Sequence, residues 1–205
     1  MIEAIGLLEL DTIAAGIEVA DAVVKMAAVE FLDTFMVTPG KYVVLVAGDP
    51  VAVQSSLDAG REVAGAALAD SLHIPFLHPG VLPAIRNSVQ LEPGLALGLV
   101  ETSSVASGVR AADDAAKGAE VQLVHLHLGR GIGGKSVLLM AGELDAVQAG
   151  VEAGSRHAEK AGRLVATRVI PQPHPDLTAQ LRAGLRRLAV REQPSPGTAT
   201  ASEEP

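Results

Sequence analysis

The chain of 205 residues has no cysteine and no tryptophan, and its aromatic residues amount to only 2%. The lack of cysteine excludes a disulfide, a thiolate metal site and a thiol nucleophile, and it is consistent with a reducing cytosol. With so few aromatic rings and a hydrophobic content of 48%, the core must consist of valine, leucine, isoleucine and alanine packed between small residues.

The chain also lacks an excess of positive charge and any long apolar run. Its formal net charge is −8, whereas nucleic-acid binding needs clustered lysine and arginine. No apolar run reaches the roughly 18 residues of a membrane span. The acidic start Met1–Ala4 leads directly into an expected strand, so we expect no signal peptide. We therefore expect neither nucleic acid nor a membrane as a partner.

What the chain does contain is an internal repeat. The segment Ala4–Glu9 returns 92 positions later as Ala96–Glu101, and Lys41–Asp49 returns 94 positions later as Lys135–Glu143. Over the two aligned blocks, 22 of 57 positions are identical. A repeat of about 90 residues is too long for a solenoid unit, so each copy is expected to be a domain.

We expect the first domain at residues 1–88, the second at 95–190 and a disordered tail at 191–205, where the composition is mostly polar. Two similar domains in one chain usually meet through one kind of interface, and such an interface suits rings better than a single active site.

Both copies show the same order of apolar runs, helical periodicity and turn residues. In the first copy we expect strands at 4–10, 29–37, 42–46 and 71–77, with helices beginning at Thr12 and Asp49. In the second copy we expect strands at 95–101, 120–128, 136–141 and 164–170, and helices at 104–118 and 144–161. A further helix is expected at 175–190. This order predicts an α+β fold with two ferredoxin-like βαββαβ domains, each an antiparallel-type sheet with two helices on one face.

The segment Gly129–Ser136 fits the phosphate-loop pattern G-x-x-x-x-G-K-[ST]. That chemistry needs a helix to begin at the Lys-Ser pair, so that its amides point at phosphate. Here the pair is followed by Val137–Gly142, which is typical of a strand. A wide glycine loop between two strands is therefore the favoured interpretation.

The histidines and acids favour structural roles over catalysis. His125 and His127 alternate on one face of an expected strand, where they are either metal ligands or, as we favour, part of a polar or interface surface. His78 and His174 each precede a proline after the last strand of a copy, which favours a structural or interface role. Glu9 and Glu101 hold the same position in the two copies and are expected to serve the fold.

Lysine and aspartate recur together in the first helix of each copy. Lys25 follows Asp21, and Lys117 follows Asp113, by four residues in both cases. This spacing predicts an ion pair on the surface of each helix, next to the helix C-terminus.

Several of these motifs resemble a known family. The segments Ala4–Glu9, Ala20–Lys25, Pro39–Lys41, Gly48–Val53 and Ile170–His174 are similar to the bacterial microcompartment shell domain. Two unpermuted copies in one chain resemble its tandem-domain subfamily, whose trimers mimic the hexamers of single-domain relatives. The likeness covers residues 4–178 and is greatest to the trimeric shell proteins of propanediol-utilisation compartments.

The resemblance implies a non-enzymatic, hexagon-shaped tile in the compartment shell, within the cytoplasm, with a central pore for small metabolites. It implies a homotrimer, with other shell proteins and encapsulated enzymes as further partners. The pore residues that it implies are Val37, Thr38, Pro39, Gly40, Gly131, Ile132, Gly133 and Gly134. The residues that it places at the tile edge are Lys25, Lys117, His78, Gln172 and His174, with Gln172 standing where the family has an arginine.

The resemblance also bears on cofactors. Propanediol relatives hold an iron–sulfur cluster through a cysteine of the first pore loop, and that position is Thr38 here. A four-iron cluster needs thiolates, so no cofactor and no metal are expected.

Two other functions compete with the shell. One is a small-molecule sensor or regulatory module of two ferredoxin-like domains, in which the glycine loop binds an anion. The other, less favoured, is a nucleotide-hydrolysing enzyme that uses residues 129–136.

Overall fold

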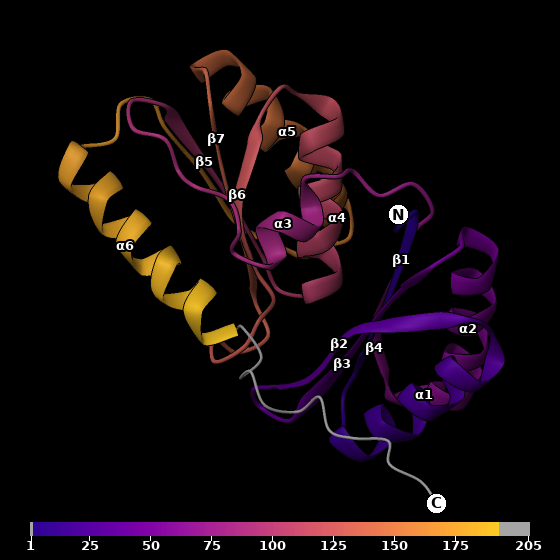
Figure 1. The fold of residues 1–205 in the computed structure, drawn as a ribbon. Helices are drawn as coiled ribbons and strands as arrows, with labels where there is room; N and C mark the ends of the chain where they lie inside the picture. Colours follow the sequence, from indigo (N-terminus) through magenta and orange to yellow (C-terminus); the bar gives the residue numbers. More distant parts are fainter. Residues whose placement is uncertain (1, 193–205) are drawn as a thin grey trace, which may run out of the picture.

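Each copy of the repeat folds into a four-stranded antiparallel sheet with two helices on one face (Figure 1). The computed structural model describes residues 2–192. The first domain consists of β1 (Ala4–Leu10), α1 (Ile13–Met26), β2 (Val29–Val37), β3 (Lys41–Gly48), α2 (Pro50–Ala64) and β4 (Leu68–Ile74). The second consists of β5 (Ala96–Thr102), α4 (Val105–Gly118), β6 (Gln122–His127), β7 (Ser136–Gly142), α5 (Leu144–Lys160) and β8 (Leu164–Ile170).

The two sheets have the same topology. Their strand orders are β2-β3-β1-β4 and β6-β7-β5-β8, and all neighbouring strands are antiparallel. The α+β fold of two tandem βαββαβ domains, predicted from the repeat, is therefore confirmed.

The first helix of each copy begins in the same way. The hydroxyl oxygen of Thr12 accepts a hydrogen bond from Ala15 N at 3.3 Å, and that of Ser104 accepts one from Ser107 N at 3.1 Å. The second helix of the first copy begins at Asp49, whose carboxylate accepts from two amides of the first turn. Hydroxyl and carboxylate caps satisfy amides that have no acceptor inside the helix.

The structure differs from the sequence prediction at the end of the first domain. The predicted strand 71–77 is β4, which runs from Leu68 to Ile74. It starts earlier because a 3₁₀ turn at Gly65–Ala67 follows α2 and sets Leu68 beside Leu10. It ends at Ile74 because Pro75 has no N–H to donate to the sheet.

Two further helices lie outside the sheets. The connector between the domains contains a short helix, α3 (Val81–Ile85), that the sequence did not predict. The helix predicted at 175–190 is α6 (Pro175–Glu192). The tail predicted at 191–205 overlaps the end of α6, and its residues 193–205 lie outside the described residues.

The two domains meet by a helix-on-sheet contact. We call the face of each sheet that its own two helices leave uncovered the open face. The open face of the first sheet, with Ile5, Leu7 and Leu72, is buried in one hydrophobic cluster with Ala106 and Val109 of α4. The second domain therefore presents a helix to the first domain, and the first presents a sheet to the second.

The open face of the second sheet is covered in part by α6, which lies across it from α4 and α5 (Figure 1). Leu181 and Leu185 of α6 pack against a cluster that includes Leu97 and Leu139. The outer strand β8 is not buried to the same extent, and Val165 on it is exposed.

Candidate pore loops and edge residues

The two loops predicted to line one pore lie against each other. Val37, at the end of β2, is buried, and a Cβ atom added to Gly134 would lie 3.4 Å from Val37 Cγ1 and 3.7 Å from Thr38 O. Thr38 and Pro39, joined by a cis peptide bond, are exposed. In the second loop Gly131, Ile132 and Gly133 are exposed as well. The exposed parts of both loops therefore flank one buried contact between the domains.

The glycines of the second loop are required by its backbone. The φ angles of Gly129, Gly131, Gly133 and Gly134 are 78°, 72°, 70° and 79°, a region that residues with a side chain rarely adopt. The loop leads into β7 at Ser136 and not into a helix. The prediction that this motif joins two strands is confirmed, and the helix N-terminus of a phosphate loop is missing at this point.

Charged side chains tie the second loop to both domains. Arg130 forms an ion pair with Asp33 of β2, and its guanidinium carbon lies 3.9 Å from the centre of the Phe35 ring. Lys135 Nζ lies 2.8 Å from Glu101 Oε1. Sequence reasoning missed Arg130, because Asp33 is 97 residues away and no motif links the two.

Glu9 lies at the contact between the domains. Its Oε1 accepts a 2.7 Å hydrogen bond from Ala106 N, in the first turn of α4. Asp70 Oδ2 accepts a 2.7 Å hydrogen bond from the hydroxyl of Ser104, the cap of the same helix. Burial raises the pKa of Glu9, the Ala106 amide opposes that rise, and the Asp70 charge adds to it. Glu9 thus joins the domains, in keeping with the predicted role in the fold.

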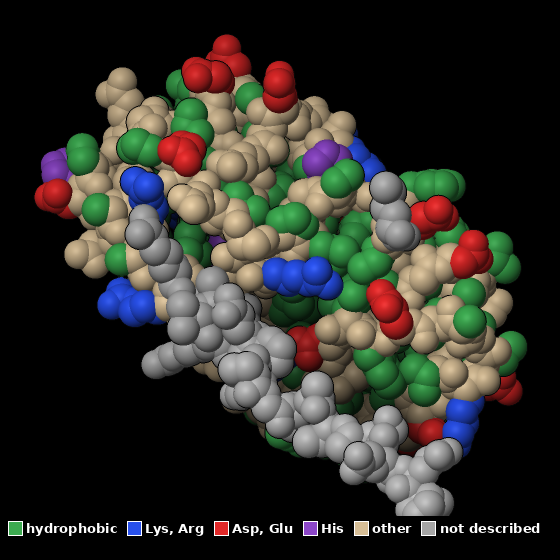
Figure 2. Space-filling model, in the orientation of Figure 1, with side chains coloured by type: hydrophobic (Ala, Val, Ile, Leu, Met, Phe, Trp, Pro, Cys, Tyr) green, Lys and Arg blue, Asp and Glu red, His purple; other side chains and the backbone are tan. Residues whose placement is uncertain are grey.

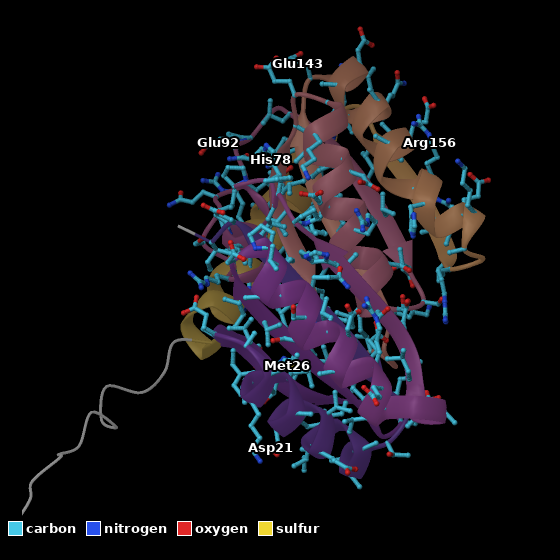
Figure 3. The ribbon with its side chains drawn as sticks, turned by 90° about the vertical axis from the view of Figure 1, so that its right-hand side faces the viewer. Asp21, Met26, His78, Glu92, Glu143 and Arg156 are labelled. Atoms are coloured by element: carbon cyan, nitrogen blue, oxygen red, sulfur yellow. The ribbon has the colours of Figure 1, made fainter. Side chains whose placement is uncertain are left out.

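The two predicted lysine–aspartate pairs are confirmed, but their surroundings differ. Lys25 Nζ lies 2.5 Å from Asp21 Oδ2 on α1, and both side chains are exposed. Figure 3 shows Asp21 on the outer side of this helix. Lys117 Nζ lies 2.6 Å from Asp113 Oδ2 and also donates to Phe76 O at 2.5 Å. Asp113 is only 1% exposed and accepts a hydrogen bond from His78 N. Lys117 is therefore part of the contact between the domains, whereas Lys25 lies on a free surface.

His78 and His174 each stabilise the start of the following helix. His78 Nδ1 accepts from Gly80 N at 3.1 Å, before α3, and His174 Nδ1 accepts from Asp176 N at 3.2 Å, within the first turn of α6. Gln172 is exposed. The structural role expected of the two His-Pro pairs is consistent with these bonds.

His125 and His127 lie edge to face, with ring centroids 5.9 Å apart. His125 Nδ1 is hydrogen-bonded to Asn87 Oδ1. Burial, with a smaller contribution from the charge of His127, lowers the pKa of His125 to about 4. Within residues 2–192, no three histidine, aspartate or glutamate side chains are grouped so as to hold a metal ion.

Among residues 2–192, no helix has both the length and the apolar character that a membrane span requires.

Large hydrophobic side chains are exposed mainly on the first domain. On the face shown in Figure 2 they gather on that domain, between scattered charged groups. The exposed ones there are Ile17, Met26, Phe31, Met36, Val51, Val63 and Phe76. Surface of this kind marks interaction sites more often than free solvent-facing surface.

Two tandem α+β domains that meet helix on sheet, with their glycine-bearing loops together, define a protein of two fused ferredoxin-like domains. Comparison with known proteins gives the same class. The BMC domain model matches residues 4–77 and again residues 96–173. The chain therefore belongs to the bacterial microcompartment (BMC) domain family.

Relatives support this assignment over nearly the whole chain. The chain is 42% identical over 184 residues to the bacterial microcompartment shell protein PduT of Citrobacter freundii. This match covers 90% of this chain and all of the relative. It is 36% identical over 91 residues to the bacterial microcompartment shell protein PduA of the same organism, and this match covers 44% of this chain and 95% of the relative.

Solved structures agree. A microcompartments protein from Desulfitobacterium hafniense DCB is 46% identical, with a TM-score of 0.79 over 87% of this chain and 99% of that chain. The fused permuted hexameric shell protein MSM0275 has a TM-score of 0.59 and is 20% identical. This match covers 77% of this chain and 82% of the MSM0275 chain, and it shows a likeness of fold alone.

The chain is thus a structural protein of a bacterial microcompartment shell and not an enzyme. The alternative of a small-molecule sensor is not favoured by these comparisons.

Proposed function

We propose that three copies of this chain close into a six-sided tile, with residues 1–88 and 95–190 as its alternating domains. The observation that carries this proposal is the contact inside the chain, where α4 packs on the open face of the first sheet. A contact between two different surfaces generates a ring when its rotation closes. The chain has a further surface of each kind for its neighbours in the ring. These are α1 and the part of the second sheet near β8, where Val165 is exposed.

In this tile the exposed residues of the two touching loops line a central pore. Thr38 supplies a hydroxyl, and Gly131 and Gly133 supply exposed backbone amides. Such groups replace part of the hydration shell of a small polar metabolite as it passes. Val37 and Gly134 are buried against each other and hold the two loops together.

At the rim, Lys25, Lys117, His78, Gln172 and His174 lie near the contacts between tiles. The tiles pack edge to edge with other shell proteins and form the wall of a compartment in the cytoplasm. Encapsulated enzymes lie on the inner side of this wall. The exposed hydrophobic side chains of the first domain support a role in assembly.

Thiol crosslinking at Thr38 tests the pore assignment, because the chain has no cysteine of its own. A Thr38→Cys variant treated with a short bismaleimide should give a covalent dimer in a denaturing gel, because each chain then carries one thiol and the reagent joins two of them. A Val51→Cys variant is the control: Val51 is 74% exposed and follows the far end of β3, more than 20 Å from the loop at about 3.3 Å per residue. Equal crosslinking of both variants would overturn the assignment.

A further inference from the structure

The repeated glutamates have different partners in the two domains. Glu9 accepts a hydrogen bond from Ala106 N and is 1% exposed. Glu101, at the same position of β5, forms an ion pair with Lys135 at 2.8 Å, and both side chains are partly exposed. Lys41 is the counterpart of Lys135, and within the described residues no ion pair joins it to Glu9. Glu9 of the first domain is thus bound to a helix amide of the other domain, whereas Glu101 of the second domain is bound to a lysine of its own domain.

The first helices of the two copies differ in their burial as well. In α4, Ala106 and Val109 are buried against the open face of the first sheet. Their counterparts in α1 are Ala14, which is exposed, and Ile17, which is 59% exposed. Ala14 N lies in the first turn of its helix, where amides have no acceptor within the helix.

Two further hydrogen bonds between the domains have counterparts that are exposed in the single chain. Asp113 accepts from His78 N, and Lys117 donates to Phe76 O. The corresponding residues of α1 are Asp21 and Lys25, and those after β8 are His174 and Gln172. All four are exposed.

We propose that Glu101 releases Lys135 when the ring closes and accepts a hydrogen bond from Ala14 N of a second copy of this chain. This inference rests on the proposed trimer. The contact inside the chain is its template: α1 of one copy packs beside β5 and β8 of the next, as α4 packs on β1 and β4. A carboxylate also interacts favourably with the positive end of the helix dipole that it meets there.

The same correspondence supplies two more contacts across the boundary between chains. Asp21 accepts from the backbone amide of His174 of the neighbour, and Lys25 donates to the carbonyl oxygen of Gln172 of the neighbour. Three residues that the family resemblance places at the tile edge therefore also lie at the seam between chains. The Lys135–Glu101 pair is the arrangement of the single chain, and it competes with ring closure.

Sedimentation of the full chain over a series of concentrations tests the exchange. Glu101→Ala should raise the concentration at which the trimer dissociates by about tenfold or more, because a charge-assisted hydrogen bond is lost at every interface. Glu101→Gln should stay closer to the wild type, since its amide oxygen still accepts from Ala14 N. Lys135→Met should dissociate no more readily than the wild type.

The outcomes separate the exchange from the trimer itself. A wild type that is never a trimer would refute the proposed ring. If the wild type is a trimer and the Glu101→Ala trimer is equally stable, the exchange would be overturned. Trimers of Glu101→Gln and Lys135→Met that are weakened as much as that of Glu101→Ala would overturn it as well.

Carbodiimide treatment provides a second measurement: a Glu101–Lys135 isopeptide should form in the dilute monomer and be suppressed in the trimer. An isopeptide of equal yield in both states would also overturn it.

Discussion

Lys117 Nζ donates a 2.5 Å hydrogen bond to the carbonyl oxygen of Phe76, 41 residues earlier in the chain. The bond joins α4 to the segment after β4, and the buried carboxylate of Asp113 neutralises the lysine there. The corresponding lysine of the first copy is Lys25, and among residues 2–192 its ion pair is with the exposed Asp21 alone.

Lys117→Ala should therefore lower the free energy of unfolding more than Lys25→Ala does. We expect a loss of about 1–2 kcal/mol for Lys117→Ala, because the Asp113 carboxylate loses a charged partner, discounted for the partial exposure of the lysine. For Lys25→Ala we expect less than about 0.5 kcal/mol. Urea denaturation of both variants measures the difference, and equal losses would contradict the role given to Lys117.

Gly108 allows α4 to lie close to β7. A Cβ atom at this position would lie 2.0 Å from Ser136 Oγ and 2.3 Å from Ser136 Cβ. Gly108→Ala should destabilise the chain by about 1–3 kcal/mol, since helix and strand must move apart. Gly184→Ala is the control: nothing lies within 4 Å of its added Cβ, and alanine in a helix should stabilise by up to about 1 kcal/mol. Thermal unfolding should move in opposite directions for the two variants, and a neutral Gly108→Ala would refute the close approach.

Glu9 should make the stability depend on pH. Its pKa in the folded chain is raised above the ordinary value of 4.5, mainly by burial. The folded state therefore keeps the proton to higher pH than the unfolded state does. The stability from this group is fully present below pH 4.5 and is lost as the pH rises through the raised pKa.

Glu9→Gln removes this titration while it keeps an oxygen that accepts from Ala106 N. We expect the wild type to lose stability relative to Glu9→Gln as the pH rises from about 4 to 8. Chemical denaturation of both proteins at several pH values gives the difference. A difference that does not change with pH, or that changes in favour of the wild type, would contradict the raised pKa.

The sequence predicted most elements because their patterns are local. β2 at 29–37 and β8 at 164–170 have the predicted bounds, since each is an apolar or β-branched run between turn residues. β4 was placed three residues too late, because the apolar residues around Pro75 continue the pattern of a strand that the proline in fact ends. The confirmed lysine–aspartate pairs are likewise a matter of spacing within one helix.

The contacts between the domains had no such signal. Glu9 and Ala106, and likewise Arg130 and Asp33, are 97 residues apart, and no motif connects them. The repeat aligned Glu9 with Glu101 and Lys25 with Lys117, but it did not show that only one member of each pair meets a partner domain in the chain. That asymmetry follows from tertiary packing, in which α4 is covered and α1 is left exposed.

The proposed tile requires three copies of the chain to close into a ring. Sedimentation equilibrium of the full chain at micromolar concentration tests it most directly. We expect one species of about 63 kDa, three times the chain mass of 21.0 kDa. A protein that remains at the mass of one chain, or that stops at a dimer of twice the chain mass, would contradict the tile.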